Sequence, residues 1–332
     1  LFPNPNHENI CNTLTEKGFK VHDFKINRKG TSLLAEFLSL CRLYFQIRSI
    51  KPDILFSYTI KPVIYTGLVS MLLRIPRRYS LITGLGYAFQ HERGRFNFTQ
   101  FIAQVMYRIA LRGVTKVFFQ NPDDQRLFHD EGILLDHIPS IVINGSGVDL
   151  KQYKPTDLPD GPSFLLIGRL LKAKGILEFI EAAQMIASEN NDVSFKIAGW
   201  RETGRDSISQ EIIDSWKENC SIKYLGPLLD VRSSIAKASV FVLPSYREGT
   251  PRTVLEAMAM GRPIITTDVP GCRETVIDGY NGFLIPPRNS MEIAVAMRRF
   301  ISDPKLADKM GKRSRQIAEK KYDVRSVNDI IL

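Results

Sequence analysis

Short apolar runs alternate with helix-like patterns along almost the whole chain, and this alternation limits the fold more than any other feature. Strands separated by helices form βαβ units, whose parallel strands pair into one sheet. The alternation occurs twice, once on each side of the Pro- and Asp-rich segment 151–162. A chain of 332 residues is long enough for two domains. We therefore predict an α/β protein of two facing Rossmann-like domains, with ligands bound beyond the carboxyl ends of the strands in the cleft between them.

The pattern also predicts the individual elements. The first stretch predicts strands at 19–24, 53–58, 78–82 and 117–120, and helices at 33–50 and 62–73. The second predicts strands at 163–168, 193–199, 222–225, 240–244, 263–267 and 282–285, a helix at 175–187, and mostly helix from 290 onward. We place the domains at 1–155 and 156–315, with a last helix at 316–332 that crosses back to the first domain. Residues 1–5 show no buried strand followed by a Gly- or Asn-rich turn, so we expect the first strand of the N-terminal domain to be missing.

Charge and cysteine content restrict the partners and the compartment. The net charge is +10, which favours anionic partners such as nucleotide phosphates or anionic lipid. The four cysteines include no C-x-x-C pair, which fits a reducing cytoplasm better than a disulfide framework or a zinc site. The longest strongly apolar run, Val63–Leu73, is too short to span a bilayer.

The segment Val242–Pro287 is the most informative for function. A predicted buried strand ends at Pro244, and a polar loop leads to Thr250 and Pro251, a favourable N-cap residue and a favourable first helical residue. We predict a helix over 251–260, followed by a Gly at its C-terminus. A strand, a Gly-containing loop and a helix N-terminus together form an anion site, because the free N–H groups and the helix dipole favour a phosphate.

Two carboxylates flank this predicted phosphate site. Glu248 lies on the loop and Glu256 on the helix, and carboxylates accept hydrogen bonds from paired hydroxyls. One can bind the hydroxyls of a sugar ring and the other those of a ribose, which is the layout of a nucleotide sugar. The alternative is that Glu248 is a solvated loop residue and that Glu256 forms a surface ion pair. The surrounding Gly-Thr-Pro and capping signals favour the functional interpretation.

A basic turn at 168–175 follows the first strand of the second domain. Its Arg169 and Lys174 can converge on a diphosphate, although solvated basic turns are common. The chain contains no Asp-x-Asp pair, so we expect no metal and no other cofactor. Arg169, Lys174 and the helix dipole would then neutralise the charge of the leaving group.

At this point the sequence resembles the family-4 group of retaining glycosyltransferases with the GT-B fold. The resemblance covers nearly the whole chain and rests on Glu248-x7-Glu256, on Gly168-Arg169 with Lys174-Gly175, and on the segments 144–149, 266–274 and 281–284. It implies that Arg169 and Lys174 bind the donor diphosphate, that Glu248 meets the donor sugar and Glu256 the ribose, and that the anomeric configuration is retained. The implied catalytic residues are Glu248, Arg169 and Lys174, and the implied donor-binding residues are Gly168, Arg169, Lys174, Glu248, Gly249, Thr250, Pro251, Leu255 and Glu256.

In the first half, the segments 59–62 and 82–89 look like a subgroup that extends undecaprenyl-diphosphate-linked sugars in bacterial glycan assembly. This implies a UDP-linked hexose or N-acetylhexosamine donor, a lipid-linked sugar acceptor bound by the first domain, and acceptor contacts from Lys61, Thr83 and Gly84. For Lys61 taken alone, capping of a strand end is slightly favoured over contact with an acceptor phosphate. Many relatives carry a His in the segment where this chain has Thr83 and Gly84.

Arginines and apolar residues are interleaved between Arg74 and Lys116, as in a basic amphipathic surface that rests on anionic lipid. The basic residues of this set are Arg74, Arg77, Arg78, Arg93, Arg95, Arg108, Arg112 and Lys116. An ordinary helix with solvated arginines explains the pattern equally well. We expect a cytoplasmic protein that binds peripherally to the inner face of the plasma membrane.

Three alternatives to a membrane-associated glycosyltransferase remain. A nucleotide-sugar epimerase would share the architecture, although the Glu-x7-Glu pattern argues against it. A non-catalytic nucleotide-sugar-binding protein would fit a missing first strand. Nucleic-acid binding would explain the charge but not Val242–Pro287, so we expect no nucleic acid as partner.

Overall fold

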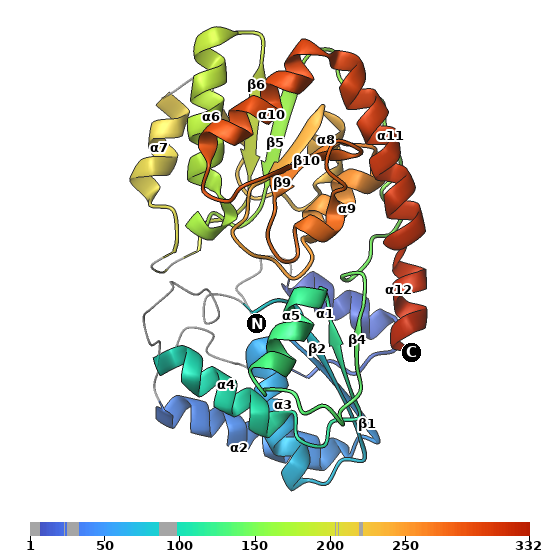
Figure 1. Ribbon diagram of the computed structural model, residues 1–332. Helices are drawn as coiled ribbons and strands as arrows, with labels where there is room; N and C mark the ends of the chain where they lie inside the picture. Colours follow the sequence, from blue (N-terminus) through green and yellow to red (C-terminus); the bar gives the residue numbers. More distant parts are fainter. Residues whose placement is uncertain are drawn as a thin grey trace. The chain divides into compact units, whose positions relative to one another are not determined.

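The computed structural model describes residues 7–22, 24, 33–85, 98–202, 204, 206–218 and 222–332. The described residues contain two sheets, one of four strands in the order β1-β2-β3-β4 and one of six in the order β10-β9-β8-β5-β6-β7 (Figure 1). The chain divides into two compact units, of which the first contains the described residues up to Leu81, Phe98–Val117 and Glu131–Pro139. The other unit contains the described residues of Ile82–Asn97, Phe118–Asp130 and Ser140–Leu332. The boundaries at 155 and 315 and the crossing of the last helix stay predictions.

The first unit is built from helices around parallel strands. Its elements are α1 (His7–Glu16), α2 (Leu33–Ile50), β1 (Ile54–Tyr58), α3 (Ile60–Leu72), β2 (Arg77–Ile82) and α4 (Phe98–Ala110), with β3 (Lys116–Phe119) at its boundary. β1 pairs with β2 in parallel. A Cβ at Gly67 of α3 would lie 2.5 Å from the carbonyl oxygen of Ala110, so only glycine lets α3 approach the end of α4 this closely.

Two predictions for the first half were wrong in part. The described residues of 19–24 form no strand, and the segment Ser140–Val142 forms β4, which the pattern did not predict. The β-propensity of a segment does not by itself specify a strand, because a strand forms only where a neighbouring strand is available to pair with it. Gly86 and Phe89 of the predicted acceptor segment, and Arg93 and Arg95 of the predicted basic surface, lie outside the described residues.

The second unit contains α5 (Pro122–Asp130) and β4 (Ser140–Val142), followed by a parallel six-stranded sheet with its helices. The strands are β5 (Ser163–Ile167), β6 (Ser194–Ala198), β7 (Ile222–Tyr224), β8 (Val240–Leu243), β9 (Ile264–Thr267) and β10 (Gly282–Ile285). The helices are α6 (Ile176–Glu189), α7 (Gln210–Glu218), α8 (Arg232–Ala236), α9 (Arg252–Ala259), α10 (Ser290–Ser302), α11 (Pro304–Lys321) and α12 (Val324–Ile331), with short 3₁₀ turns at Lys172–Lys174 and Arg273–Thr275.

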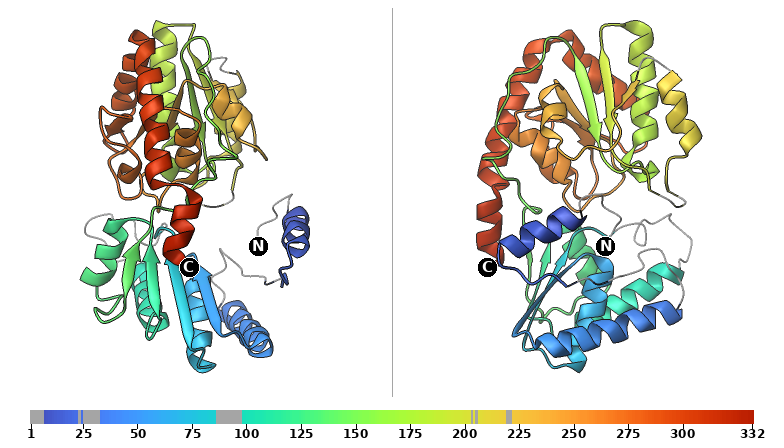
Figure 2. Two further views of the ribbon diagram at one scale, coloured as in Figure 1. Left: turned by 90° about the vertical axis from the view of Figure 1, so that its right-hand side faces the viewer. Right: turned by 180° about the vertical axis from the view of Figure 1, so that it is seen from behind.

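Helices cover both faces of this sheet (Figure 2). Apolar side chains of α6, α7 and α10 pack on one face in a core that includes Phe164, Phe179 and Phe195. Side chains of α8 and α9 pack on the other face, where Phe241 and Leu255 belong to a second core. A sheet covered on both faces needs continuously apolar strands, and every residue of β5, β8 and β9 is buried.

The strand order reverses between β5 and β8. The chain runs from β5 outward through β6 and β7, and then returns to place β8 on the other side of β5. Such a reversal opens a crevice beyond the carboxyl ends of the two strands, where ligands bind in open α/β sheets. The loops that start at Gly168 and Pro244 follow these two strands and therefore flank the crevice. Across the described ranges, no helix is both long and apolar enough to cross a membrane.

Candidate functional site

The loops after β5 and β8 lie against each other. The N–H of Tyr246 donates to the carbonyl of Ala173 at 2.9 Å. Gly175 has a φ of 69°, and a Cβ there would lie 2.1 Å from the carbonyl oxygen of Pro244. Glycine is therefore required at this position both by its backbone conformation and by the approach of the second loop. This contact brings the basic turn and the acidic loop together.

Lys174 and Glu248 form an ion pair at this contact. Their side chains are only 17% and 12% exposed, and the Ser245 hydroxyl donates a second bond to Glu248 Oε1 at 2.7 Å. The stem of Lys174 lies over Gly168, 3.9 Å from where a Cβ of that residue would be. The structure thus holds one ammonium and one carboxylate in fixed positions at the predicted diphosphate site.

Arg169 follows β5 directly but makes a different contact. Its guanidinium pairs with Glu202 at 2.9 Å, and its side chain is 43% exposed. The described contacts therefore do not join Arg169 to Glu248, although both residues follow neighbouring strands. Its role at a diphosphate stays a prediction.

Glu256 lies on α9 and is almost fully buried. Its Oε1 accepts hydrogen bonds from the Tyr153 hydroxyl and from Arg252 Nε, each at 3.0 Å. Burial raises the pKa of the Glu256 carboxyl, and the charge of Arg252 opposes that rise. Burial and the nearby carboxylate raise the pKa of Tyr153 to about 12. Sequence reasoning missed Tyr153, which is 103 residues from Glu256, whereas the i,i+4 spacing of Arg252 and Glu256 was a readable signal.

The start of α9 differs from the prediction by one residue. Pro251 occupies the N-cap position, no side chain caps the described helix, and α9 begins at Arg252. The Thr250 hydroxyl instead donates to the carbonyl of Gln120 at 2.9 Å, so Thr250 as N-cap was wrong. The uncapped first-turn N–H groups keep their capacity to bind an anion. Leu255, another predicted donor residue, is fully buried in the second core.

The predicted acceptor residues fall into different units. Thr83 and Gly84 lie against the donor loop, because a Cβ at Gly249 would be 2.4 Å from the Thr83 carbonyl oxygen and one at Gly84 would be 2.9 Å from Gly249 N. Lys61 belongs to the first unit, where its ammonium pairs with Glu36 at 2.6 Å. Lys61 lies two residues after Thr59, whose φ of 69° is a strained conformation for a β-branched residue.

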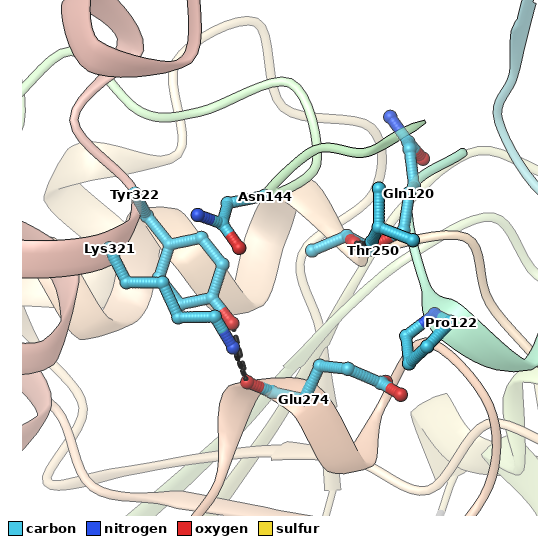
Figure 3. A pocket seen from close by; sticks show the side chains of 8 residues that line it. Gln120, Pro122, Asn144, Thr250, Glu274, Lys321 and Tyr322 are labelled. Carbon is cyan, nitrogen blue, oxygen red and sulfur yellow. Dashed lines mark hydrogen bonds between the residues drawn. The ribbon is translucent and has the colours of Figure 1, made fainter. Parts of the chain in front are cut away.

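Beside Thr250, a cavity of about 170 Å³ opens in the second unit (Figure 3). It is lined by Gln120, Pro122, Val142, Asn144, Thr250, Glu274, Lys321 and Tyr322. The carbonyl of Glu274 accepts from Lys321 Nζ at 2.8 Å and from the Tyr322 hydroxyl at 2.5 Å. Burial raises the pKa of the Glu274 carboxyl, whose Oε2 has no hydrogen-bond partner among the described residues. Glu274 is the last residue of the segment 266–274, which carries part of the family resemblance.

The loop that carries Glu248 is also held by residues that sequence reasoning did not identify. The side-chain amide of Asn121 donates to the carbonyl of Gly249 at 3.0 Å, and the guanidinium of Arg247 pairs with Asp124. Asn121 directly precedes α5 and Asp124 lies in its first turn, more than 120 positions earlier in the chain. A run of Asn-Pro-Asp-Asp could have been read as a helix start, but not as an anchor for a distant loop.

Comparison with known proteins gives two family matches and several relatives. Residues 151–317 match the family described as Glycosyl transferases group 1, and residues 3–121 match the family described as Glycosyl transferase 4-like. The chain is 26% identical over 322 residues to the N,N'-diacetylbacillosaminyl-diphospho-undecaprenol alpha-1,3-N-acetylgalactosaminyltransferase of Campylobacter jejuni, covering 92% of this chain and 82% of the relative. It is 27% identical over 306 residues to the UDP-Gal:alpha-D-GlcNAc-diphosphoundecaprenol alpha-1,3-galactosyltransferase of Escherichia coli, covering 86% and 76%.

Solved structures with similar folds include two at a TM-score of 0.76. One is Anabaena HepE in complex with UDP, at 20% identity and with 96% of this chain and 87% of that one covered. The other is sucrose-phosphate synthase from Thermosynechococcus elongatus, at 21% identity and with 92% and 78% covered. At these identities the likeness concerns the fold.

Proposed function

The chain belongs to the group 1 glycosyl transferases and has the GT-B fold, and from this premise we propose that it glycosylates a lipid-diphosphate-linked sugar in bacterial polysaccharide or glycan biosynthesis. The donor would be a UDP-linked hexose or N-acetylhexosamine. The predicted family, fold class and enzyme class are confirmed by the matched family and the similar structures. The names of the Campylobacter and Escherichia relatives, both of which act on undecaprenol-diphosphate sugars, support the acceptor class.

The observation that carries the proposal is the Lys174–Glu248 pair at the reversal of strand order. A diphosphate placed there would receive the Lys174 ammonium and the first-turn N–H groups of α9. Glu248 would then be released from the ion pair to accept hydroxyls of the donor sugar. Glu256, held by Tyr153 and Arg252, would accept the ribose hydroxyls.

In the proposed reaction, the acceptor hydroxyl oxygen bonds to the anomeric carbon while the bond from that carbon to the β-phosphate oxygen breaks. UDP leaves with the electron pair of that bond, and the hydroxyl proton passes to the leaving phosphate oxygen. Lys174 and the α9 dipole stabilise the charge that develops on the diphosphate, and such stabilisation is usually the largest catalytic contribution. Protein groups would supply it without a metal ion or another cofactor.

We place the membrane contact on α2. Leu34, Phe37, Leu38 and Phe45 recur at helical spacing, so they form one apolar stripe, and all four side chains are exposed. The helix carries exposed Arg42 and Arg48, and its single acidic residue, Glu36, is paired with Lys61. An exposed apolar stripe with unopposed positive charge favours an anionic lipid surface. We therefore propose peripheral binding to the cytoplasmic face of the membrane, which would bring the enzyme to a lipid-linked acceptor.

A transfer assay tests the proposed function. Purified protein is incubated with UDP-galactose, UDP-glucose, UDP-N-acetylglucosamine or UDP-N-acetylgalactosamine and a polyprenyl-diphosphate sugar, and UDP release and the extended lipid are measured. We expect release of UDP that depends on the acceptor. Conversion of the donor without acceptor would indicate an epimerase instead. Binding of UDP without turnover of any donor would contradict the transferase assignment.

A further inference from the structure

The peptide that carries Glu248 is fixed from two sides. The N–H of Glu248 donates to the carbonyl of Pro270 at 3.1 Å. A Cβ at Gly271 would lie 2.2 Å from the Glu248 carbonyl oxygen, so the backbone of 270–271 touches this peptide directly. On the other side, Asn121 Nδ2 donates to the carbonyls of Gly249 at 3.0 Å and of Glu248 at 3.4 Å. The position of the Glu248 side chain therefore depends on both contacts.

The side-chain amide of Asn121 forms hydrogen bonds through both its NH₂ group and its carbonyl oxygen. It is fully buried and directly precedes α5, and its Oδ1 accepts from the N–H of Asp124 at 2.8 Å. This is an N-cap bond, and it fixes the amide with its NH₂ group toward the loop. The neighbours of Asn121 in the chain, Gln120 and Pro122, line the same cavity as Thr250 (Figure 3). The carbonyl of Gln120 accepts a hydrogen bond from the Thr250 hydroxyl at 2.9 Å.

Asp124 forms a second contact with the same loop, an ion pair with Arg247. Its carboxylate is buried, accepts from Asn121 Nδ2 at 3.1 Å and pairs with the guanidinium of Arg247, the residue before Glu248. Burial raises the pKa of Asp124, and the charge of Arg247 opposes that rise. A buried carboxylate is costly unless it is paired and hydrogen-bonded. Because Arg247 is the charged partner of Asp124, moving the loop away would leave a buried charge unpaired, and the contact therefore holds the loop in place.

We propose that Asn121, together with Asp124, is a positioning residue that sets the place of Glu248 at the donor sugar. The inference rests on the proposed function, because Glu248 acts on a sugar only if the chain binds a sugar nucleotide. Neither residue needs to touch the substrate. Small displacements of a reacting or orienting group lower rates steeply, with about 1 Å costing on the order of 100-fold. Loss of the Asn121 contact should therefore lower turnover far more than it lowers affinity for the nucleotide.

The test is Asn121→Ser, compared with Asn289→Ser. Serine keeps an N-cap acceptor for the N–H of Asp124 but cannot reach the carbonyls of Glu248 and Gly249. Asn289 caps α10 through the N–H of Glu292 and is an N-cap asparagine outside the donor loop. We expect Asn121→Ser to lower kcat about tenfold or more, with the affinity for UDP nearly unchanged. Asn289→Ser should change neither.

Amide hydrogen exchange of the peptide that spans 244–251 gives a second measurement that does not need activity. The N–H of Glu248 should exchange faster in Asn121→Ser and at the wild-type rate in Asn289→Ser. Unchanged kcat and exchange would overturn the proposal, as would equal losses of kcat and UDP affinity, which would indicate general damage to the site. Wild-type protein that transfers no sugar would refute the proposed function instead, while the exchange rates would still decide whether Asn121 holds the loop.

Discussion

Replacing Lys174 by Ala tests its ion pair with Glu248 both as a structural contact and as a donor contact. With exposed fractions of 17% and 12%, the pair lies between two measured classes. Surface pairs contribute about 0.2–1 kcal/mol, and breaking a fully buried pair costs about 3–5 kcal/mol. We therefore expect Lys174→Ala to lower the free energy of unfolding by about 2 kcal/mol. For a folding unit of roughly 150–250 residues, this corresponds to a fall in melting temperature of about 4–8 °C.

The expected effect on catalysis is larger. Loss of a donor that stabilises developing charge lowers kcat by about 100- to 1,000-fold, or about 2.7–4 kcal/mol. Initial rates of UDP release, measured well below the melting temperature, report this loss separately from unfolding. A double variant, Lys174→Ala with Glu248→Gln, removes the unpaired charge that the single variant leaves behind. It should recover most of the melting temperature without recovering activity. Activity that returns together with stability, or a single variant with nearly wild-type kcat/KM, would refute a donor role for Lys174.

Three further predictions follow from the same contacts. Burial raises the pKa of Glu256 above its ordinary 4.5, so the folded state binds this proton more tightly than the unfolded state, and the carboxyl destabilises the fold as pH rises past 4.5. Thermal unfolding from pH 4 to 8 should therefore show Glu256→Gln gaining stability relative to wild type as pH rises, while calorimetry shows weaker UDP binding; a constant difference across pH would contradict the assignment. In flotation with phosphatidylglycerol vesicles, Phe37→Ser with Phe45→Ser should reduce binding, whereas Met291→Ser, at an exposed apolar residue of α10, should not; equal binding by all three proteins would contradict a membrane role for α2. Transfer should continue in excess EDTA, and loss of activity that Mg²⁺ restores would show that a metal is required.

The central strands β5 and β8 of the second unit could be predicted because every residue in them is buried, so each reads as an apolar run between turn residues. The strand at 282–285 was predicted with its observed bounds. The predicted helix at 33–50 also matched α2, although this helix shows an exposed apolar stripe that pattern analysis would assign to the core. The predicted strand at 19–24 was wrong for a different reason. Its apolar and polar residues alternate as in a strand, but its described residues form no strand.

The candidate site was predictable in its chain-local part only. Glu248, Lys174 and the start of α9 lie in or just after the loops that follow β8 and β5, and such strand–loop–helix patterns are local in the sequence. The contacts that hold these residues cross large sequence distances, as between Asn121 and Gly249 or Tyr153 and Glu256. Nothing in a single sequence specifies such pairs. The cap at Thr250 failed for the same reason, because a distant backbone carbonyl takes its hydroxyl.

A structure of the protein with UDP bound tests the central claim most directly. The account predicts the diphosphate at the reversal of strand order, within hydrogen-bond distance of Lys174 Nζ and of the first N–H groups of α9, with Glu256 Oε atoms on the ribose hydroxyls. A diphosphate bound elsewhere, with the Lys174–Glu248 pair unchanged, would contradict it.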